Sequence, residues 1–178
     1  LFRSQGADLH WVAPLPDDWQ LGLAGVMQRH NAAVARAALQ ALEPLGWTVD
    51  ENAIRCGFAE ARWPGRLQSA RWQNHPLLLD GAHNPPAAAQ LALERGRWPG
   101  EDAGVCWILA MQAHKQAPEM LEHLLDPSDR AWIVPVPDHH SWTRSRLAEQ
   151  CPQWHNQLLE ADSGEAALLE IQERGAWP

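Results

Sequence analysis

Short hydrophobic runs alternate with helix-like segments along the chain from about residue 67 onwards. Residues 77–80, 105–110 and 131–134 have the length and composition of buried strands. Helix-like segments of mixed polarity lie between and after these runs, beginning with PPAAAQLALER. Because strands and helices that alternate at this spacing form parallel βαβ units, the pattern predicts an α/β fold with a mainly parallel sheet and helices on both faces. Ligands of such sheets bind at the carboxyl ends of the strands.

The first part of the chain has a different pattern. Hydrophobic and polar residues alternate around residues 9–12, which predicts a short strand. An alanine-rich segment from about residue 28 to residue 43 places Val34, Ala38 and Leu42 on one stripe and predicts a helix. A proline and a glycine follow this segment and are expected to end the helix.

Residues 49–66 separate these two patterns. They contain a short polar helical pattern and then the turn-forming sequence WPG, which is typical of a connection between folding units. We therefore expect a partial domain in residues 1–48, a linker in residues 49–66 and a second domain in residues 67–178.

Composition and charge limit the kinds of partner. No hydrophobic run in the 178 residues approaches the about 20 residues of a membrane-spanning helix, so we expect no membrane. The net charge of −8 disfavours nucleic acid, whose binding depends on clustered Lys and Arg, but a local site for a nucleotide stays possible. The three cysteines form no CxxC pair and suit a reducing compartment, so we expect a cytoplasmic protein, with a monomer as the default.

The most specific chemical signal is LLLDGAHNPPAAAQLALE, residues 77–94. A strand that ends at Asp80 and a helix that begins near Pro85 would hold Asp80 and His83 at the ligand-binding edge of a sheet. There a carboxylate can accept hydrogen bonds from ribose hydroxyls, and an imidazole can donate to phosphate oxygens. The structural alternative is that Asp80 and Asn84 cap the helix, with Pro85 at its first position. These residues alone leave both interpretations open.

Four segments of the chain carry a recognisable pattern: GVMQRHNAA in residues 25–33, WPGRLQ in residues 63–68, DGAHNP in residues 80–85, and ILAMQAHKQAPEMLEHLL in residues 108–125. Together they resemble the folylpolyglutamate synthase/dihydrofolate synthase branch of the Mur ligase superfamily. The resemblance implies a Mur ligase C-terminal, Rossmann-like glutamate-ligase domain in residues 67–178, with its last strand missing. It also implies that residues 1–48 are the last helix and strands of the central ATP-binding domain.

The resemblance further implies an ATP-dependent amide ligase that adds L-glutamate to a folate or dihydropteroate through an acyl phosphate. Asn31, Arg66 and Asp80 would then bind the adenine, phosphates and ribose of ATP. His83 would be the catalytic candidate, near the transferred phosphoryl group or the glutamate. The physical argument for Arg66 is its rigid fork of donors, which suits phosphate.

Gln28 and Lys115 are further candidates for contacts to substrate or phosphate. The chain departs from the family pattern beside both of them. Met27 stands where the family has a histidine, and the family's Asp-Lys-Asp turn reads His114-Lys115-Gln116, so roles for the two acids are not carried over. We assign no metal ligand in this chain: His139 and His140 are adjacent, point in different directions and predict a loop.

The sequence contains no GxxxxGK[ST] phosphate-binding loop. The resemblance implies that this loop and the Mg²⁺ ligands belong to a missing amino-terminal part, so we expect truncation at both ends and no activity of the fragment alone. Two alternatives stay open: another Mur-type amino-acid ligase, or a non-catalytic module that binds a nucleotide or folate.

Overall fold

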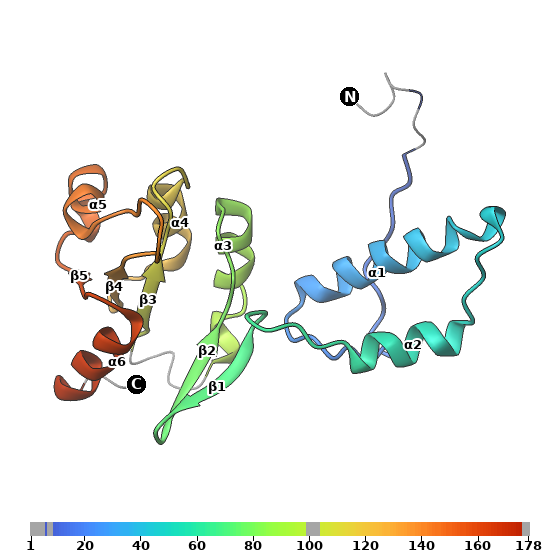
Figure 1. The fold of residues 1–178 in the computed structure, drawn as a ribbon, viewed down its shortest axis with the longest axis horizontal. Coiled ribbons are helices and arrows are strands. Elements are labelled where there is room, and N and C mark those ends of the chain that lie inside the picture. The colour runs from blue at the N-terminus through green and yellow to red at the C-terminus, as the bar shows by residue number, and fades with distance from the viewer. Residues whose placement is uncertain (1–5, 7–8, 99–103, 176–178) are drawn as a thin grey trace. The chain divides into compact units, whose positions relative to one another are not determined.

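The computed structural model of the chain describes residue 6, residues 9–98 and residues 104–175 (Figure 1). The chain divides into two compact units, Leu1–Gly81 (unit 1) and Ala82–Pro178 (unit 2). Each unit has a hydrophobic core of its own. The boundary between the units lies inside the DGAHNP segment, and the expected assignment of residues 1–48, 49–66 and 67–178 to parts of a larger protein stays a prediction.

Unit 1 contains two packed helices. α1 (Met27–Gln40) is followed by a short 3-10 helix (Glu43–Leu45) and then by α2 (Glu51–Glu60). Asp50 begins α2, because its carboxylate accepts a hydrogen bond from the Ala53 N–H at 3.2 Å. The small core of this unit comprises Leu15, Trp19, Ala33 and Ile54.

Trp19 is the largest side chain of this core. It is only 4% exposed, and the guanidinium carbons of Arg55 and Arg36 lie 4.0 Å and 5.4 Å from its ring centroid. The same arginines form ion pairs with Asp18 at 3.2 Å and Glu51 at 3.1 Å. The arginines therefore cover the edge of a core that has few buried side chains, through cation–π contacts and ion pairs.

The helix expected over residues 28–43 is confirmed as α1, but its hydrophobic stripe does not face the core. Val34 is 60% exposed and Leu42 is 40% exposed, whereas Ala33 is buried. The reason is that α1 packs onto the segment that contains Trp19 through Ala33. Ala33 lies on a different face of α1 from the exposed Val34. Periodicity thus identified the helix and not its buried side.

The two segments that flank α1 also differ from expectation. The strand expected over residues 9–12 is wrong, because this segment has no regular secondary structure and Trp11 is 87% exposed. A strand needs a hydrogen-bonding neighbour, and among the described residues no strand pairs with this segment. The helical pattern within residues 49–66 is confirmed as α2, which packs on α1 through Ile54.

β1 (Gln68–Trp72) and β2 (His75–Leu79) form an antiparallel hairpin at the end of unit 1. The run at residues 77–80 is therefore confirmed as a strand, but its expected place in a parallel sheet is wrong. Its expected burial is wrong as well, since Leu78 and Leu79 are 40% and 43% exposed. The hairpin forms because the segment directly before β2 satisfies the backbone hydrogen bonds of this strand.

Unit 2 is an α/β fold with a parallel three-stranded sheet in the order β3-β4-β5 (Figure 1). The strands are β3 (Cys106–Ala110), β4 (Arg130–Val134) and β5 (Leu158–Glu160). The helices are α3 (Pro85–Ala92), α4 (Ala117–Leu124), α5 (Arg144–Gln150) and α6 (Gly164–Glu173). The strands expected over residues 105–110 and 131–134 are confirmed, and so is their parallel arrangement.

β4 is the central strand and is buried on both faces. Trp132 and Val134 pack with Ala167 and Ile171 of α6 on one face. Because side chains alternate along a strand, Ala131 and Ile133 point to the other face, and they are also buried. This arrangement confirms a sheet that is covered on both sides.

Asp129, just before β4, is a buried junction of several segments. The Arg95 guanidinium donates two hydrogen bonds of 2.6 Å to its carboxylate. The Trp107 indole N–H donates at 2.9 Å, and the backbone N–H groups of Val105 and Asp126 donate at 2.8 Å and 3.0 Å. These bonds connect the segment after α3, the start of β3 and the loop before β4.

The environment of Asp129 keeps its carboxyl ionised. Burial alone raises the pKa of this carboxyl, but the hydrogen bonds from Arg95, Trp107 and the backbone outweigh burial, and the pKa is lowered from its ordinary value. A buried carboxylate with this many donors fixes the geometry of unit 2 around the start of the sheet.

Among the described residues, no helix is both long enough and hydrophobic enough to span a membrane.

Candidate functional site

A pocket of about 320 Å³ lies at the carboxyl edge of the parallel sheet in unit 2. Ala110 and Met111 line it where β3 ends, and Val136 lines it just after β4. His83 from the DGAHNP segment and Lys115 from the loop before α4 also line the pocket. The pocket therefore combines a hydrophobic wall with two side chains that suit an anion, at the edge where such sheets bind ligands.

The start of α3 holds His83 at this pocket. The next residue, Asn84, caps the helix, because its Oδ1 accepts a hydrogen bond from the Ala87 N–H at 2.9 Å. Pro85 occupies the first turn of the helix, where its missing N–H costs nothing. The capping interpretation is thus confirmed for Asn84. His83 is exposed beside a helix N-terminus, an environment that favours negative charge.

A turn places Lys115 on the opposite loop. Its backbone N–H donates to the Gln112 carbonyl at 2.9 Å, and α4 begins two residues later. The next residue, Gln116, uses its side-chain amide to donate to the Glu119 carboxylate at 3.0 Å. None of the ion pairs formed by the described residues includes Lys115. Lys115, a half-buried residue, therefore brings a positive charge to the pocket.

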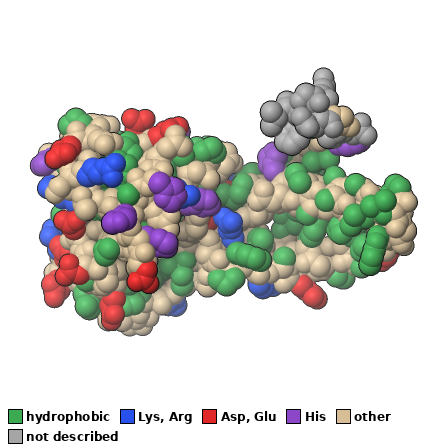
Figure 2. Space-filling view, turned by 45° about the horizontal axis from the view of Figure 1, so that its top comes forward, with side chains coloured by type: hydrophobic (Ala, Val, Ile, Leu, Met, Phe, Trp, Pro, Cys, Tyr) green, Lys and Arg blue, Asp and Glu red, His purple; other side chains and the backbone are tan. Residues whose placement is uncertain are grey.

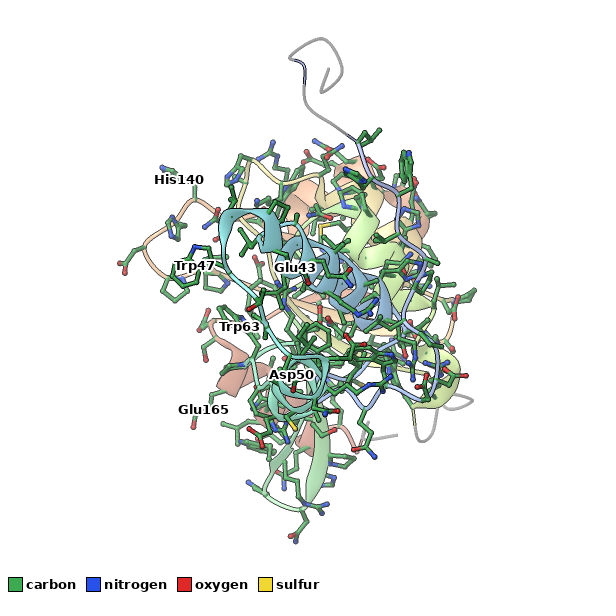
Figure 3. All side chains as sticks on the ribbon, turned by 90° about the vertical axis from the view of Figure 1, so that its right-hand side faces the viewer. Glu43, Trp47, Asp50, Trp63, His140 and Glu165 are labelled. Atoms are coloured by element: carbon green, nitrogen blue, oxygen red, sulfur yellow. The ribbon has the colours of Figure 1, made fainter. Side chains whose placement is uncertain are left out.

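The loops that follow β3 and β4 are joined to each other. Gln112 and Ser141 form an isolated antiparallel bridge, and the Ala113 N–H donates to the His140 carbonyl at 2.8 Å. Figure 3 shows His140 projecting outward from the loop after β4. Figure 2 shows histidine side chains gathered on one face of unit 2. Among the described residues, no group of three His, Cys, Asp or Glu side chains is arranged to hold a metal ion.

Asp80 fixes the WPGR segment in unit 1. Its Oδ2 accepts a hydrogen bond from the Leu67 N–H at 2.9 Å, and the Gly81 N–H donates to the Gly65 carbonyl at 2.7 Å. Leu67 has φ +43°, a conformation that a leucine adopts only where its surroundings hold it. The exposed Arg66 lies between the two residues that these bonds hold. The WPGR and DGAHNP motifs are thus physically connected, which their separation in the sequence does not reveal.

Asn31 and Gln28 form a pair on α1. The Asn31 Nδ2 donates to the Gln28 Oε1 at 2.9 Å, as residues three apart on a helix can do. Gln28 is only 7% exposed, whereas Asn31 is exposed. Because α1 begins at Met27, Asn31 lies in the second turn and does not cap the helix.

The structure therefore brings the candidate residues together in pairs. His83 and Lys115 line one pocket, Asp80 holds the backbone next to Arg66, and Gln28 holds Asn31. The expected convergence of Arg66, Asp80 and His83 on one cleft involves both units and stays a prediction, as do the ligand-binding roles of all six residues.

Sequence reasoning missed five residues that line the pocket: Ala110, Met111, Gln112, Met120 and Val136. Met120 lies on α4, whereas the other four lie at or just beyond the carboxyl ends of β3 and β4. That position on parallel strands is a signal that could have identified these four. Nothing in their residue types marks them.

A family comparison identifies a matching protein family over most of unit 2. Residues 65–169 match the family described as "Dihydrofolate synthetase, C-terminal domain". The match includes His83 and Lys115 of the pocket, and it also includes Asp80 and the Leu67 N–H that it binds.

Curated relatives carry folate-related names. Dihydrofolate synthase/folylpolyglutamate synthase of Escherichia coli is 34% identical over 140 residues, which cover 79% of this chain and 32% of the relative. The protein of the same name from Bacillus subtilis is 40% identical over 77 residues, which cover 43% of this chain and 18% of the relative. The matches thus span about a third or less of the length of these relatives.

Solved structures have the same fold. Mycobacterium tuberculosis folylpolyglutamate synthase complexed with ADP matches with a TM-score of 0.73 and 24% identity, over 88% of this chain and 35% of that one. Escherichia coli FolC in complex with DHPP and ADP matches with a TM-score of 0.62 and 28% identity, over 80% and 32%. A bifunctional folylpolyglutamate synthase/dihydrofolate synthase with Mn, AMPPNP and L-glutamate bound matches with a TM-score of 0.57 and 26% identity, over 75% and 32%. The expected ligase-type α/β fold is confirmed by these similarities.

Proposed function

The chain belongs to the family of the dihydrofolate synthetase C-terminal domain, and we propose that it forms part of an ATP-dependent ligase that joins L-glutamate to dihydropteroate or a folate. In this proposal the chain supplies one wall of the active site and does not catalyse the reaction alone. The observation that carries the proposal is the pocket at the carboxyl edge of the sheet, where His83 and Lys115 lie together.

The proposed reaction has two steps. An oxygen of the folate carboxylate attacks the γ-phosphorus of ATP, and ADP leaves. The amine of glutamate then attacks the carbonyl carbon of the acyl phosphate, loses a proton and displaces phosphate as the amide forms. Both steps move negative charge among oxygens, so catalysis depends on positioned cationic groups and donors.

Lys115 and His83 suit this chemistry. An ammonium group that has no carboxylate partner among the described residues can neutralise a phosphate or a glutamate carboxylate. The imidazole of His83 at the start of α3 can donate to the same group. We assign binding and charge neutralisation to Lys115, and a catalytic contact near the transferred phosphoryl group to His83.

We assign contacts to ATP to residues of unit 1. Asn31 offers an amide to the adenine, and Arg66 offers guanidinium donors to the phosphates. Gln28 orients the Asn31 amide through its 2.9 Å hydrogen bond. Asp80 contributes to the ribose site and also holds the backbone next to Arg66, through the bond from Leu67.

The proposal includes ATP and a divalent cation, Mg²⁺. The relative with bound Mn and AMPPNP supports a divalent cation in this family of folds. We place no metal ligand on this chain and expect the ligands in the part of the enzyme that holds the phosphate-binding loop, because this sequence has no GxxxxGK[ST] motif. The cation would supply charge neutralisation on the ATP phosphates.

We also propose a monomeric protein of the cytoplasm with only small-molecule partners. The support is the net charge of −8, which disfavours nucleic acid, and the three free thiols at Cys56, Cys106 and Cys151.

The test is ADP release with dihydropteroate or tetrahydrofolate plus L-glutamate. We expect turnover by the full-length protein and none by the 178-residue chain. In the full-length protein, His83→Ala should lower kcat by about a hundredfold, which is typical of the loss of one positioned donor in the transition state. Substantial turnover by the chain alone, or full activity of the variant, would show that the machinery is misplaced.

The role of Asp80 needs two variants, because its carboxylate also holds Leu67. Asp80→Asn keeps an oxygen acceptor for the Leu67 N–H, whereas Asp80→Ala removes it. A direct contact to ribose predicts a raised KM for ATP in both variants. A purely structural role predicts a raised KM in Asp80→Ala alone.

A further inference from the structure

Trp142 lies in the segment between β4 and α5 and does not line the pocket, yet it is bonded to residues that do. Its side chain is 5% exposed. Its backbone N–H donates to the carbonyl of Met111 at 2.9 Å. Its indole Nε1–H donates to the carbonyl of Lys115, also at 2.9 Å. Trp142 thus binds both Met111 and Lys115, which stand at the two ends of the loop between β3 and α4 that brings the Lys115 side chain to the pocket.

The indole is itself held from outside. The Arg146 guanidinium carbon lies 4.0 Å from the Trp142 ring centroid. Arg146 belongs to the first turn of α5, whose cap is Thr143, and the Thr143 Oγ1 accepts a hydrogen bond from the Arg146 N–H at 3.3 Å. The cation–π contact and the cap together fix the direction of the indole N–H.

We propose that Trp142 is a positioning residue that sets Lys115 at the rim of the pocket for binding an oxyanion, a role that rests on the function proposed above. The turn at Gln112 fixes the Lys115 N–H, and the Trp142 indole fixes its carbonyl, so both peptide groups of Lys115 are restrained. The side chain then reaches the pocket from a backbone that does not need to reorganise when an anion binds. Preorganised donors of this kind lower the cost of binding.

A phenylalanine cannot replace this tryptophan in the proposed role. Phenylalanine fills most of the same volume and stacks under Arg146, but it has no N–H. The Lys115 carbonyl would lose its donor from the segment after β4, and the rim of the pocket would be free to shift. The proposal therefore predicts an effect on anion binding that acts through Lys115 and not through the core.

A double-mutant cycle on the 178-residue chain tests this prediction. The probes are inorganic phosphate and L-glutamate, titrated separately and followed by ¹H–¹⁵N NMR shifts of the residues that line the pocket. Lys115→Ala should weaken binding of at least one probe, and the probe that responds identifies the anion. Trp142→Phe should weaken binding of the same probe by about threefold to tenfold, the worth of one hydrogen bond. In the Lys115→Ala background, Trp142→Phe should have no further effect.

Trp132→Phe is the matched control. Trp132 is also a buried tryptophan, and its indole donates to Glu170 at 3.0 Å, but it packs on the α6 face of the sheet, away from the pocket. The Trp132→Phe variant should lower the denaturation midpoint, as Trp142→Phe does, and should leave the affinity for both probes unchanged. If Trp142→Phe does not fold, Arg146→Gln, which removes the stacked cation and keeps the indole, takes its place in the cycle.

The outcomes separate the two proposals. If Trp142→Phe weakens binding equally in both backgrounds, or not at all while Lys115→Ala does, the positioning role is wrong and the pocket assignment stands. If Lys115→Ala changes the affinity of neither probe, or neither probe binds, the pocket assignment is wrong and the role of Trp142 falls with it.

Discussion

The two units bury their side chains to very different degrees. In unit 2, the central strand β4 has Trp132 and Ile133 almost fully buried, on opposite faces of the sheet. In unit 1, Leu45 and Trp47 are 72% and 71% exposed, and Figure 2 shows hydrophobic side chains over its surface. A sheet that is covered on both sides buries both faces of its central strand, here from Ala131 to Val134, whereas two helices bury one stripe each. The pocket therefore lies on the unit that buries more of its hydrophobic side chains.

Removing the buried carboxylate of unit 2 should have the largest effect. Asp129→Asn removes the buried countercharge of the Arg95 guanidinium, which keeps only its 3.2 Å ion pair with the exposed Asp126. It also replaces one of the two carboxylate oxygens, which accept from Arg95 and Trp107, by an amide group that cannot accept. We expect the free energy of unfolding of unit 2 to fall by about 3–5 kcal/mol. Urea denaturation followed by the near-ultraviolet signal measures it, with exposed Asp162→Asn as the control. A loss as small as that of the control would mean that the carboxylate does not hold the unit together.

Truncation of a core side chain in unit 1 should have the second-largest effect on stability. Ile54→Ala removes one of the few buried side chains there, and we expect a loss of about 2–3 kcal/mol. Amide hydrogen exchange should show faster exchange in α1 and α2 and unchanged protection in β3 and β4. Equal loss of protection in both units would show that they unfold together, which contradicts the comparison.

Acid should weaken unit 2 through Asp129. Because its folded pKa is lowered, this carboxyl contributes stability that is complete above its unfolded pKa of about 3.9 and is lost as pH falls through the folded value. Each unit of difference between the two pKa values corresponds to about 1.4 kcal/mol. Urea midpoints between about pH 6 and pH 3 measure the loss. Asp129→Asn should show a shallower fall than the parent chain, and an equal fall would contradict the assignment.

Removal of one helix N-cap should have the smallest effect, and it can be compared between the two units. Asp50 caps α2 in unit 1 (Figure 3), and Ser163 caps α6 in unit 2, each by accepting a backbone N–H bond. Asp50→Ala and Ser163→Ala should each cost about 1 kcal/mol. Because unit 1 has the smaller core, Asp50→Ala should fray α2 visibly by hydrogen exchange, whereas α6 stays protected in Ser163→Ala. Equal fraying would mean that core size does not set local stability here.

The sequence predicted the parts of the fold that depend on local periodicity. The strands β3 and β4 and the helices of unit 2 were identified because each carries its own hydrophobic pattern. The hairpin of β1 and β2 was missed, since a run of leucines specifies a strand and not its partner. The short β5 and the exposed stripe of α1 were missed for a related reason: burial is set by neighbours that are distant in sequence.

The candidate site shows the same division. The position of His83 at a helix start and of Lys115 on a turn followed from the motifs, and the structure places both at one pocket. The bond from Leu67 to Asp80 and the bond from Trp142 to Lys115 could not be predicted, because each joins residues that only the folded chain brings together. The same holds for Asp129, whose donors come from several segments.

The most direct test of the central claim is a crystal structure of the full-length protein with AMPPNP and L-glutamate. We predict an oxygen of the glutamate or of the γ-phosphate within about 3.2 Å of the His83 imidazole or the Lys115 ammonium group. Ordered density for both ligands at other positions, with neither one at the pocket of unit 2, would contradict the account.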